Sequence, residues 1–134
     1  MKTLVLGAAI VDIIMKIPRL PKSGEDILCT ERKLTIGGCA YNVSNILRSF
    51  NVKHDLFVPV GCGIYADIIR RELNEDGYEI LINDLEMDNG YCLCLVEENG
   101  ERSFITVNGI EANHKKEWFH KNKSKWFPCE NEEF

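Results

Sequence analysis

Hydrophobic positions along the chain form two patterns, continuous apolar runs and helical spacing. Apolar runs over Thr3–Ile10 and His54–Val60 are typical of strands buried on both faces of a parallel sheet. Apolar residues three or four positions apart predict helices over Gly38–Phe50 and Ile64–Asn74. A third strand is expected over Tyr78–Asn83. This alternation of strands and helices predicts right-handed crossovers and a parallel α/β sheet.

The apolar stripe of each helix is expected to face the sheet. The stripes consist of Val43, Ile46, Leu47 and Phe50 in the first helix, and of Ile64, Ile68 and Leu73 in the second. Asn51 follows the last periodic residue of the first helix, which predicts a left-handed cap there.

A second group of extended segments predicts a small additional sheet. Residues 11–17 and 27–35 are extended around the turn residues Pro18, Pro21 and Gly24. Two later runs, 91–96 and 102–107, are joined by a Glu-Glu-Asn-Gly sequence that favours a hairpin. We therefore expect strands of a small second sheet over about 11–35 and 91–108, inserted in one α/β domain, and a short helix near 115–120.

Composition argues against a nucleic-acid-binding protein and against a membrane-spanning one. The chain has 134 residues, is 45% hydrophobic and carries a formal net charge of −5. This balance argues against nucleic acid as a partner, because such proteins usually carry a basic surface. No apolar run is long enough for a membrane span, and no secretory signal is evident, so we expect a cytoplasmic protein without a membrane partner.

The six cysteines contain no Cys-x-x-Cys pair. Cys92 and Cys94 flank Leu93, so on a strand both thiols point to the same face. A metal site is one interpretation of this pair, and reduced core cysteines are the interpretation that we favour. We therefore predict no metal ligands in this chain.

Residues 61–66 match the dinucleotide-binding pattern Gly-x-Gly-x-x-Ala between a strand and a helix. Asp84, at the end of the next strand, stands where such proteins hold the ribose. The alternative is that Gly61 and Gly63 only allow a tight turn. Taken alone, the pattern leaves an NAD-dependent oxidoreductase open.

A second group of residues favours recognition of a polyol. Gly37 and Gly38 open the first helix and let a ligand approach the backbone, and Asn42 offers an amide on its first turn. Asp12 follows the first strand, and its two oxygens can accept hydrogen bonds from adjacent hydroxyls. The alternatives are a capping role for Asp12 and a solvent-facing position for Asn42.

The order of the motifs along the chain distinguishes dinucleotide binding from polyol recognition. Gly7-x-x-x-x-Asp12, Pro21–Glu25 and Gly37-Gly38-x-x-x-Asn42 follow one another at close spacing. Together with Val60-Gly61 and Asn99–Arg102, this order resembles the N-terminal part of the ribokinase-like (PfkB family) carbohydrate kinases, over about residues 3–113. The resemblance assigns Gly61 and Gly63 to the turn of that family, which reduces the oxidoreductase to a minor alternative.

The resemblance implies a fold and an activity. The fold is a ribokinase-like parallel αβα sheet with a small β lid, here truncated to its N-terminal portion. The activity is ATP-dependent phosphorylation of a sugar or nucleoside hydroxyl, with Mg²⁺ as the metal. Asp12, Gly37, Gly38 and Asn42 match the family's substrate contacts, and the lid leaves a homodimer open.

Departures from the family bear on both catalysis and substrate. The family's late Gly-Ala-Gly-Asp segment is absent, and no Walker motif replaces it, so we expect no catalytic residue and no complete ATP or Mg²⁺ site here. Ile10 and Cys39 replace an Asn and a Lys of ribokinases, which favours a nucleoside or a less polar sugar over free ribose. A non-catalytic sugar-binding or interaction module remains the main alternative.

Overall fold

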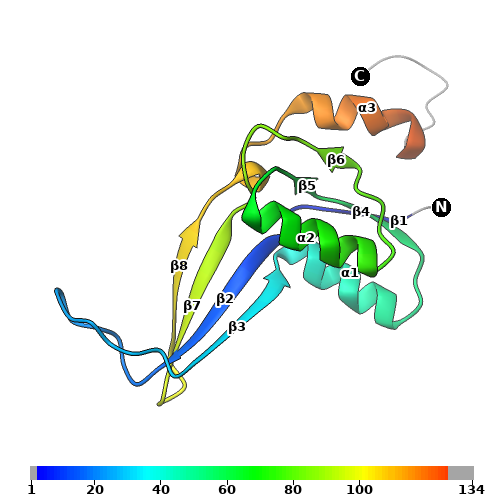
Figure 1. Ribbon diagram of the computed structural model, residues 1–134. Coiled ribbons are helices and arrows are strands. Elements are labelled where there is room, and N and C mark those ends of the chain that lie inside the picture. Colours follow the sequence, from blue (N-terminus) through cyan, green and yellow to red (C-terminus); the bar gives the residue numbers. More distant parts are fainter. Residues whose placement is uncertain (1–2, 127–134) are drawn as a thin grey trace.

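The computed structural model describes the backbone of residues 3–126 and the side chains of residues 3–121. Groups of strands along the chain are separated by the helices α1 and α2 (Figure 1). The elements are β1 (Thr3–Leu6), β2 (Ile10–Ile17), β3 (Glu31–Gly37), α1 (Cys39–Ser49), β4 (His54–Phe57), β5 (Pro59–Val60), α2 (Ile64–Glu75), β6 (Ile82–Asn83), β7 (Tyr91–Glu97), β8 (Arg102–Val107), the 3₁₀ turn η1 (Ile110–Ala112) and α3 (Lys116–Trp126).

The α/β part is built from parallel strand pairs, as the alternation of elements predicts. β1 pairs with β4, with Val5 opposite Leu56, and β5 pairs with β6, with Pro59 opposite Ile82. Both α1 and α2 lie against this part of the chain (Figure 1). None of the helices within residues 3–126 is long and apolar enough to cross a bilayer.

The second sheet, which we call the lid, has four strands in the order β3-β2-β7-β8. β2 runs antiparallel to β3 and parallel to β7, and β7 turns into the antiparallel β8. The hairpin turn is the predicted one, since Gly100 has φ +87° and its N–H donates to the Glu97 carbonyl at 2.9 Å. The extended segments expected on either side of residue 24 are β2 and β3.

Several boundaries differ from the predicted ones, and the run predicted as one strand over His54–Val60 is divided into β4 and β5. The first apolar run is not one strand, because the chain bends after Leu6 and continues at Ile10 as β2 of the lid. The third strand is only Ile82–Asn83, and the last helix is longer, Lys116–Trp126. An apolar run cannot show where a chain leaves one sheet and enters another, because both environments bury apolar side chains.

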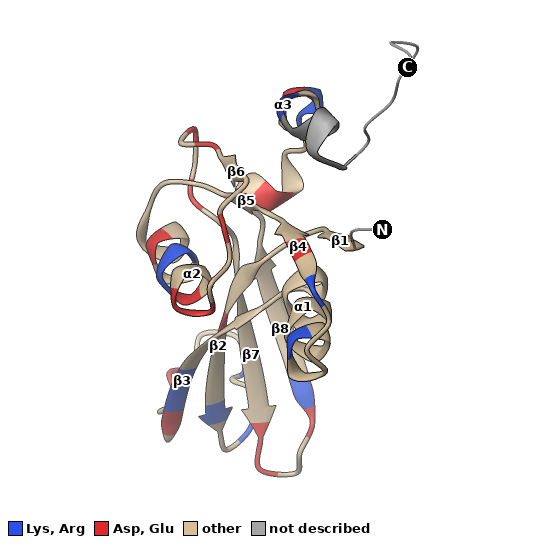
Figure 2. Cartoon of the chain, turned by 90° about the vertical axis from the view of Figure 1, so that its right-hand side faces the viewer, with Lys and Arg blue, Asp and Glu red and all other residues tan. Residues whose placement is uncertain are grey.

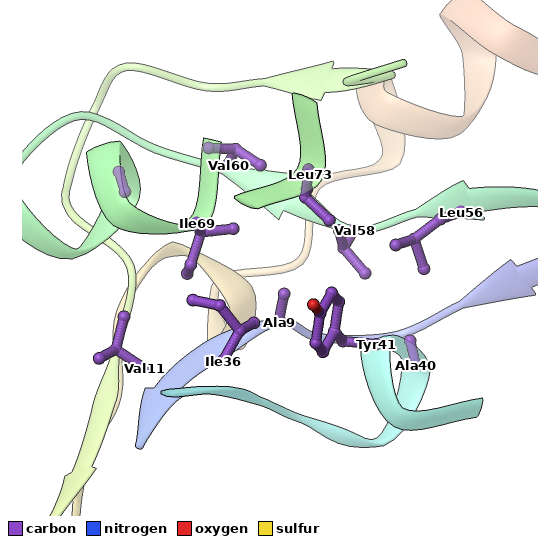
Figure 3. Close-up of a cluster of buried hydrophobic side chains, with 11 residues drawn as sticks. Ala9, Val11, Ile36, Ala40, Tyr41, Leu56, Val58, Val60, Ile69 and Leu73 are labelled. Carbon is purple, nitrogen blue, oxygen red and sulfur yellow. The ribbon is translucent and has the colours of Figure 1, made fainter. Parts of the chain in front are cut away.

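A hydrophobic cluster joins the base of the lid to the α/β part (Figure 3). It holds Val11 and Ile36 from the lid, Tyr41 from α1, Val58 beside β4, and Ile69 from α2. Because the base of the lid is buried in the same core as both helices, the position of Asp12 next to Val11 is set by packing.

The predicted buried stripe of α1 is wrong at three of its four positions, and only Leu47 is partly buried. Val43, Ile46 and Phe50 are exposed, the last at 75%, whereas Ala40, Tyr41 and Ser44 face the sheet. The small residues Ala40 and Ser44 bring α1 close to β1, where a Cβ on Gly7 would lie 3.0 Å from the Ala40 Cβ. Close approach of the backbones therefore selects small residues for this contact.

In α2 the prediction is partly wrong. Leu73 is buried at 1% exposure as expected, and Ile68 packs against the core. Ile64 is 75% exposed, and Ala66 and Ile69 complete the inner face instead. Asn51, at φ +55°, adopts the predicted left-handed conformation after α1.

Candidate functional site

Asp12 lies on β2 at the base of the lid. Its register partners are Thr35 on β3 and Cys92 on β7, and Cys92 in turn pairs with Thr106 on β8. Paired residues point to the same face of a sheet, so one polar row crosses all four strands of the lid. The Thr106 hydroxyl donates to the Cys92 sulfur at 3.5 Å.

Gly37 provides the space that the Asp12 carboxylate occupies. A Cβ on Gly37 would lie 2.0 Å from Asp12 Oδ2, far inside van der Waals contact. Gly37 is itself buried at the end of β3. The structure therefore brings two of the predicted site residues into direct contact, and it explains why a residue without a side chain stands there.

The Asp12 carboxylate makes no hydrogen bond or ion pair with another residue of the described chain. Its side chain is half-buried, and this burial raises the pKa of the Asp12 carboxyl above the ordinary value of 3.8. Partly buried acceptors are usually satisfied by a partner. An unpaired carboxylate beside glycine backbone is a suitable acceptor for ligand hydroxyls.

Gly38 and Asn42 form the beginning of α1. Gly38 is the N-cap residue at φ +99°, and a Cβ there would lie 2.4 Å from the Ala8 carbonyl oxygen. The Asn42 N–H donates to the Gly38 carbonyl at 3.0 Å, and the Asn42 side chain is exposed on the first helical turn. The structure shows no hydrogen bond between the side chains of Asn42 and Asp12.

Thr35, Cys92 and Thr106 were missed by sequence reasoning. Their membership of the Asp12 row follows from strand register, which no short motif reports. Cys92 and Cys94 are both buried, and no group of three or more His, Cys, Asp or Glu gathers as a metal site among the residues that the structure describes.

The Gly61–Ala66 turn has a structural role that competes with nucleotide binding. Asp88 accepts hydrogen bonds from the N–H groups of Tyr65 and Ala66, at 3.2 and 2.7 Å, so its carboxylate caps α2. A Cβ on Gly63 would lie 2.3 Å from that carboxylate. The helix terminus that would hold a pyrophosphate is therefore taken by an acidic side chain.

Asp84 is also engaged. Its Oδ2 accepts from Lys115 Nζ at 2.8 Å and from Trp118 Nε1 at 2.9 Å, and these bonds lower the pKa of Asp84. A hollow of about 360 Å³ opens beside it, between β6 and α3. The Asp84 carboxylate thus already accepts two hydrogen bonds from within the chain. These bonds join the end of β6 to α3 and the residue before it, which is a structural role and not ribose binding.

The Pro21–Glu25 motif forms a turn in the β2–β3 connection. The Arg19 guanidinium and the Lys22 N–H both donate to the Glu25 carboxylate, which lowers its pKa to about 2. These groups are exposed. Their hydrogen bonds therefore stabilise the turn between β2 and β3 and do not form a buried site.

The chain is similar in structure to several solved kinases. The chain superimposes on Methanocaldococcus jannaschii nucleoside kinase with a TM-score of 0.73, at 20% identity over 87% of this chain and 39% of that one. It superimposes on Arabidopsis thaliana ribokinase, solved with ribose and ATP, with a TM-score of 0.66, at 24% identity over 81% of this chain and 36% of that one. The fold is thus that of the ribokinase-like α/β proteins, and the predicted fold class is confirmed.

A family model described as pfkB family carbohydrate kinase matches residues 2–134. The chain belongs to this family. A curated relative, the uncharacterized sugar kinase YegV of Escherichia coli strain K12, is 36% identical over 115 residues, which is 86% of this chain and 36% of the relative. The chain therefore spans about a third of the length of the relative that it matches.

Proposed function

We propose that this chain supplies the sugar-binding half of an ATP-dependent sugar or nucleoside kinase. The observation that carries the proposal is the unpaired, half-buried Asp12 carboxylate held over Gly37 at the base of the lid. A ligand between the lid and the beginning of α1 would donate two hydroxyls to Asp12. It would also receive backbone contacts from Gly37 and Gly38 and an amide contact from Asn42.

The polar row on the lid indicates the kind of ligand. Apart from Asp12, its members Thr35, Cys92 and Thr106 are neutral. Ile10, at the start of β2, and Cys39, at the start of α1, bring no charge either. Asp12 is thus the only charged group among these six residues, which favours a neutral sugar or nucleoside over a sugar phosphate.

ATP and Mg²⁺ belong to the activity that we propose for the whole kinase. Ribokinase structures solved with ADP or ATP support the use of this nucleotide. The described residues contain no acidic cluster suited to Mg²⁺, and the turn at α2 is capped by Asp88. Because the sequence lacks the Gly-Ala-Gly-Asp segment of the family, we propose that the ATP and Mg²⁺ sites and the catalytic base lie in other parts of the kinase.

A panel of ligands tests the proposal. We expect D-ribose, D-fructose, adenosine or inosine to raise the melting temperature of the chain in a concentration-dependent way, because a ligand that binds only the folded state stabilises it. Asn42→Ala is expected to reduce this shift, and Asn74→Ala, at an exposed position near the end of α2, serves as the matched control. Equal shifts in all three proteins, or none in the wild type, would contradict the proposed site.

A non-catalytic sugar-binding module is the second candidate, because every proposed contact here concerns binding. ADP formation separates the two functions. We expect no ADP from this chain alone with ATP, Mg²⁺ and the panel. Sugar-dependent ADP formation above the rate of ATP hydrolysis would overturn the assignment of the catalytic base to another part of the kinase.

The lid also supports a homodimer. On the face opposite Asp12, the apolar row Leu34, Ile13, Leu93 and Ile105 crosses the sheet, with Leu34 and Ile105 about half exposed. Charged residues of the lid gather mainly toward its far end, leaving this middle row uncharged (Figure 2). Two such rows would bury each other face to face.

Ile105→Glu is expected to dissociate this dimer. Burial of one Ile is worth roughly 1.5–3 kcal/mol, so the dissociation constant should rise by about tenfold or more. Sedimentation equilibrium measures the change, and Glu98→Gln at the hairpin tip is the control. A wild-type chain that stays monomeric at every accessible concentration would rule out the lid dimer.

A further inference from the structure

The segments that connect the lid to the α/β part meet at two glycines. β7 begins after Gly90, and β8 ends before Gly109. A Cβ on Gly109 would lie 2.2 Å from the Gly90 nitrogen and 2.4 Å from the Asp88 carbonyl oxygen. Only residues without side chains allow two backbones to cross this closely.

The Glu111 side chain bridges this crossing. One carboxylate oxygen accepts from the Gly90 N–H at 2.8 Å, and the other accepts from the Gly109 N–H at 2.9 Å. Glu111 is 7% exposed, so both bonds lie away from water. The bond from Gly109 is local and would be enough to stabilise the 3₁₀ turn η1. The bond from Gly90 is not local, because it joins η1 to a segment 21 residues earlier in the chain.

The same crossing is tied to the rest of the site. The Gly90 carbonyl accepts from the N–H of Val11, the residue before Asp12, at 3.3 Å. On its other side, the buried Asn89 accepts from the Gly61 N–H at 2.8 Å and donates to the Pro59 carbonyl at 3.0 Å. Three lid strands, β2, β7 and β8, are thus anchored to the α/β part through residues 88–90 (Figure 1).

We propose that Glu111 is the positioning residue that fixes the lid, and with it Asp12, against the α/β part that carries Asn42. A carboxylate is needed because both partners are N–H donors. The amide of Gln would offer one acceptor and turn two donor hydrogens toward another N–H. Asp keeps both acceptor oxygens, but its side chain is one methylene shorter. We therefore expect it to form a normal hydrogen bond with only one of the two glycine N–H groups.

Hydrogen exchange of the backbone amides tests the role of Glu111. In Glu111→Gln we expect the amides of Gly90, Gly109, β7 and β8 to exchange about tenfold faster or more, because a hydrogen bond to a charged group is lost. Amides of α1 and β4 should keep their wild-type rates. Glu111→Asp should show a smaller increase confined to the same amides, and Glu98→Gln, exposed at the hairpin tip, should show none.

Each other outcome contradicts the proposal. Unchanged hydrogen-exchange rates of the lid amides in Glu111→Gln would mean that the Glu111 bridge does not stabilise the lid. An equal increase in α1 and β4, or loss of the folded state in both Glu111 variants, would make Glu111 an ordinary core residue. The importance of this bridge for ligand binding rests on the proposed function. The exchange measurement uses no ligand, so the positioning role of Glu111 and the proposed sugar-binding function are tested separately.

Discussion

Asp12→Ala is expected to weaken binding of the sugar or nucleoside by at least about 100-fold. The substitution removes both oxygens that would accept ligand hydroxyls, and each hydrogen bond to a charged group is worth roughly 1.5–3 kcal/mol. Gly37 and Asn42 would remain in place, so their contacts cannot replace a charged acceptor. Isothermal titration with the ligand that stabilises the wild type measures the loss.

Thr106→Val is the matched control for this variant. It changes another member of the same polar row without altering charge or size, and its hydroxyl donates only to the Cys92 sulfur within the described chain. We expect it to change affinity by less than about tenfold. If Asp12→Ala bound as tightly as Thr106→Val, Asp12 would not be the main ligand contact.

The raised pKa of Asp12 adds a pH-dependent prediction. A folded-state pKa above the unfolded value gives stability that is complete below pH 3.8 and is lost as the pH rises through the raised pKa. The ionised carboxylate therefore destabilises the free chain at neutral pH. We expect Asp12→Asn to melt at a higher temperature than the wild type at pH 7, with the difference disappearing below pH 3.8. A lower melting temperature of Asp12→Asn at pH 7 would show that the carboxylate has a stabilising partner.

Gly38→Ala is expected to lower the free energy of unfolding by about 2–4 kcal/mol. The φ of +99° is unfavourable for a residue with a side chain, and the new Cβ would lie 2.4 Å from the Ala8 carbonyl oxygen. Because the clashing atom is backbone, relief requires a shift between the β1–β2 connection and the beginning of α1. Urea denaturation measures the change in the free energy of unfolding.

Gly37→Ala provides the contrast. Its φ lies outside the left-handed region, and the new Cβ would meet a side-chain oxygen of Asp12, which can rotate away. We expect a loss of stability below about 1 kcal/mol together with a loss of ligand binding similar to that of Asp12→Ala. Equal destabilisation by the two glycine variants would mean that the Gly37–Asp12 contact is structural.

The fold was predictable from sequence wherever local chemistry determines the structure. The Asn99-Gly100 hairpin and the left-handed Asn51 depend on the conformational preferences of single residues. The inner face of α1 was not predictable, because Ala40 and Ser44 were selected by the approach of β1. Hydrophobic periodicity locates an apolar stripe but does not show which neighbour covers it.

The site was predictable in part for the same reason. Asp12, Gly37, Gly38 and Asn42 fall in compact motifs, and the structure places Asp12 against Gly37. The bridge made by Glu111 depends on a contact between distant segments, as does the Asp88 cap that occupies the end of α2. Sequence spacing does not report contacts between distant segments. The glycine pattern by itself therefore left nucleotide binding open at a helix end that Asp88 caps.

A crystal structure of the chain with its most stabilising sugar or nucleoside tests the central claim most directly. The account predicts ligand hydroxyls within about 3.2 Å of the Asp12 carboxylate, beneath the lid, with the Asn42 amide contacting the same ligand. A ligand seated beside Asp84 or against the Gly61–Ala66 turn, with Asp12 still free, would contradict it.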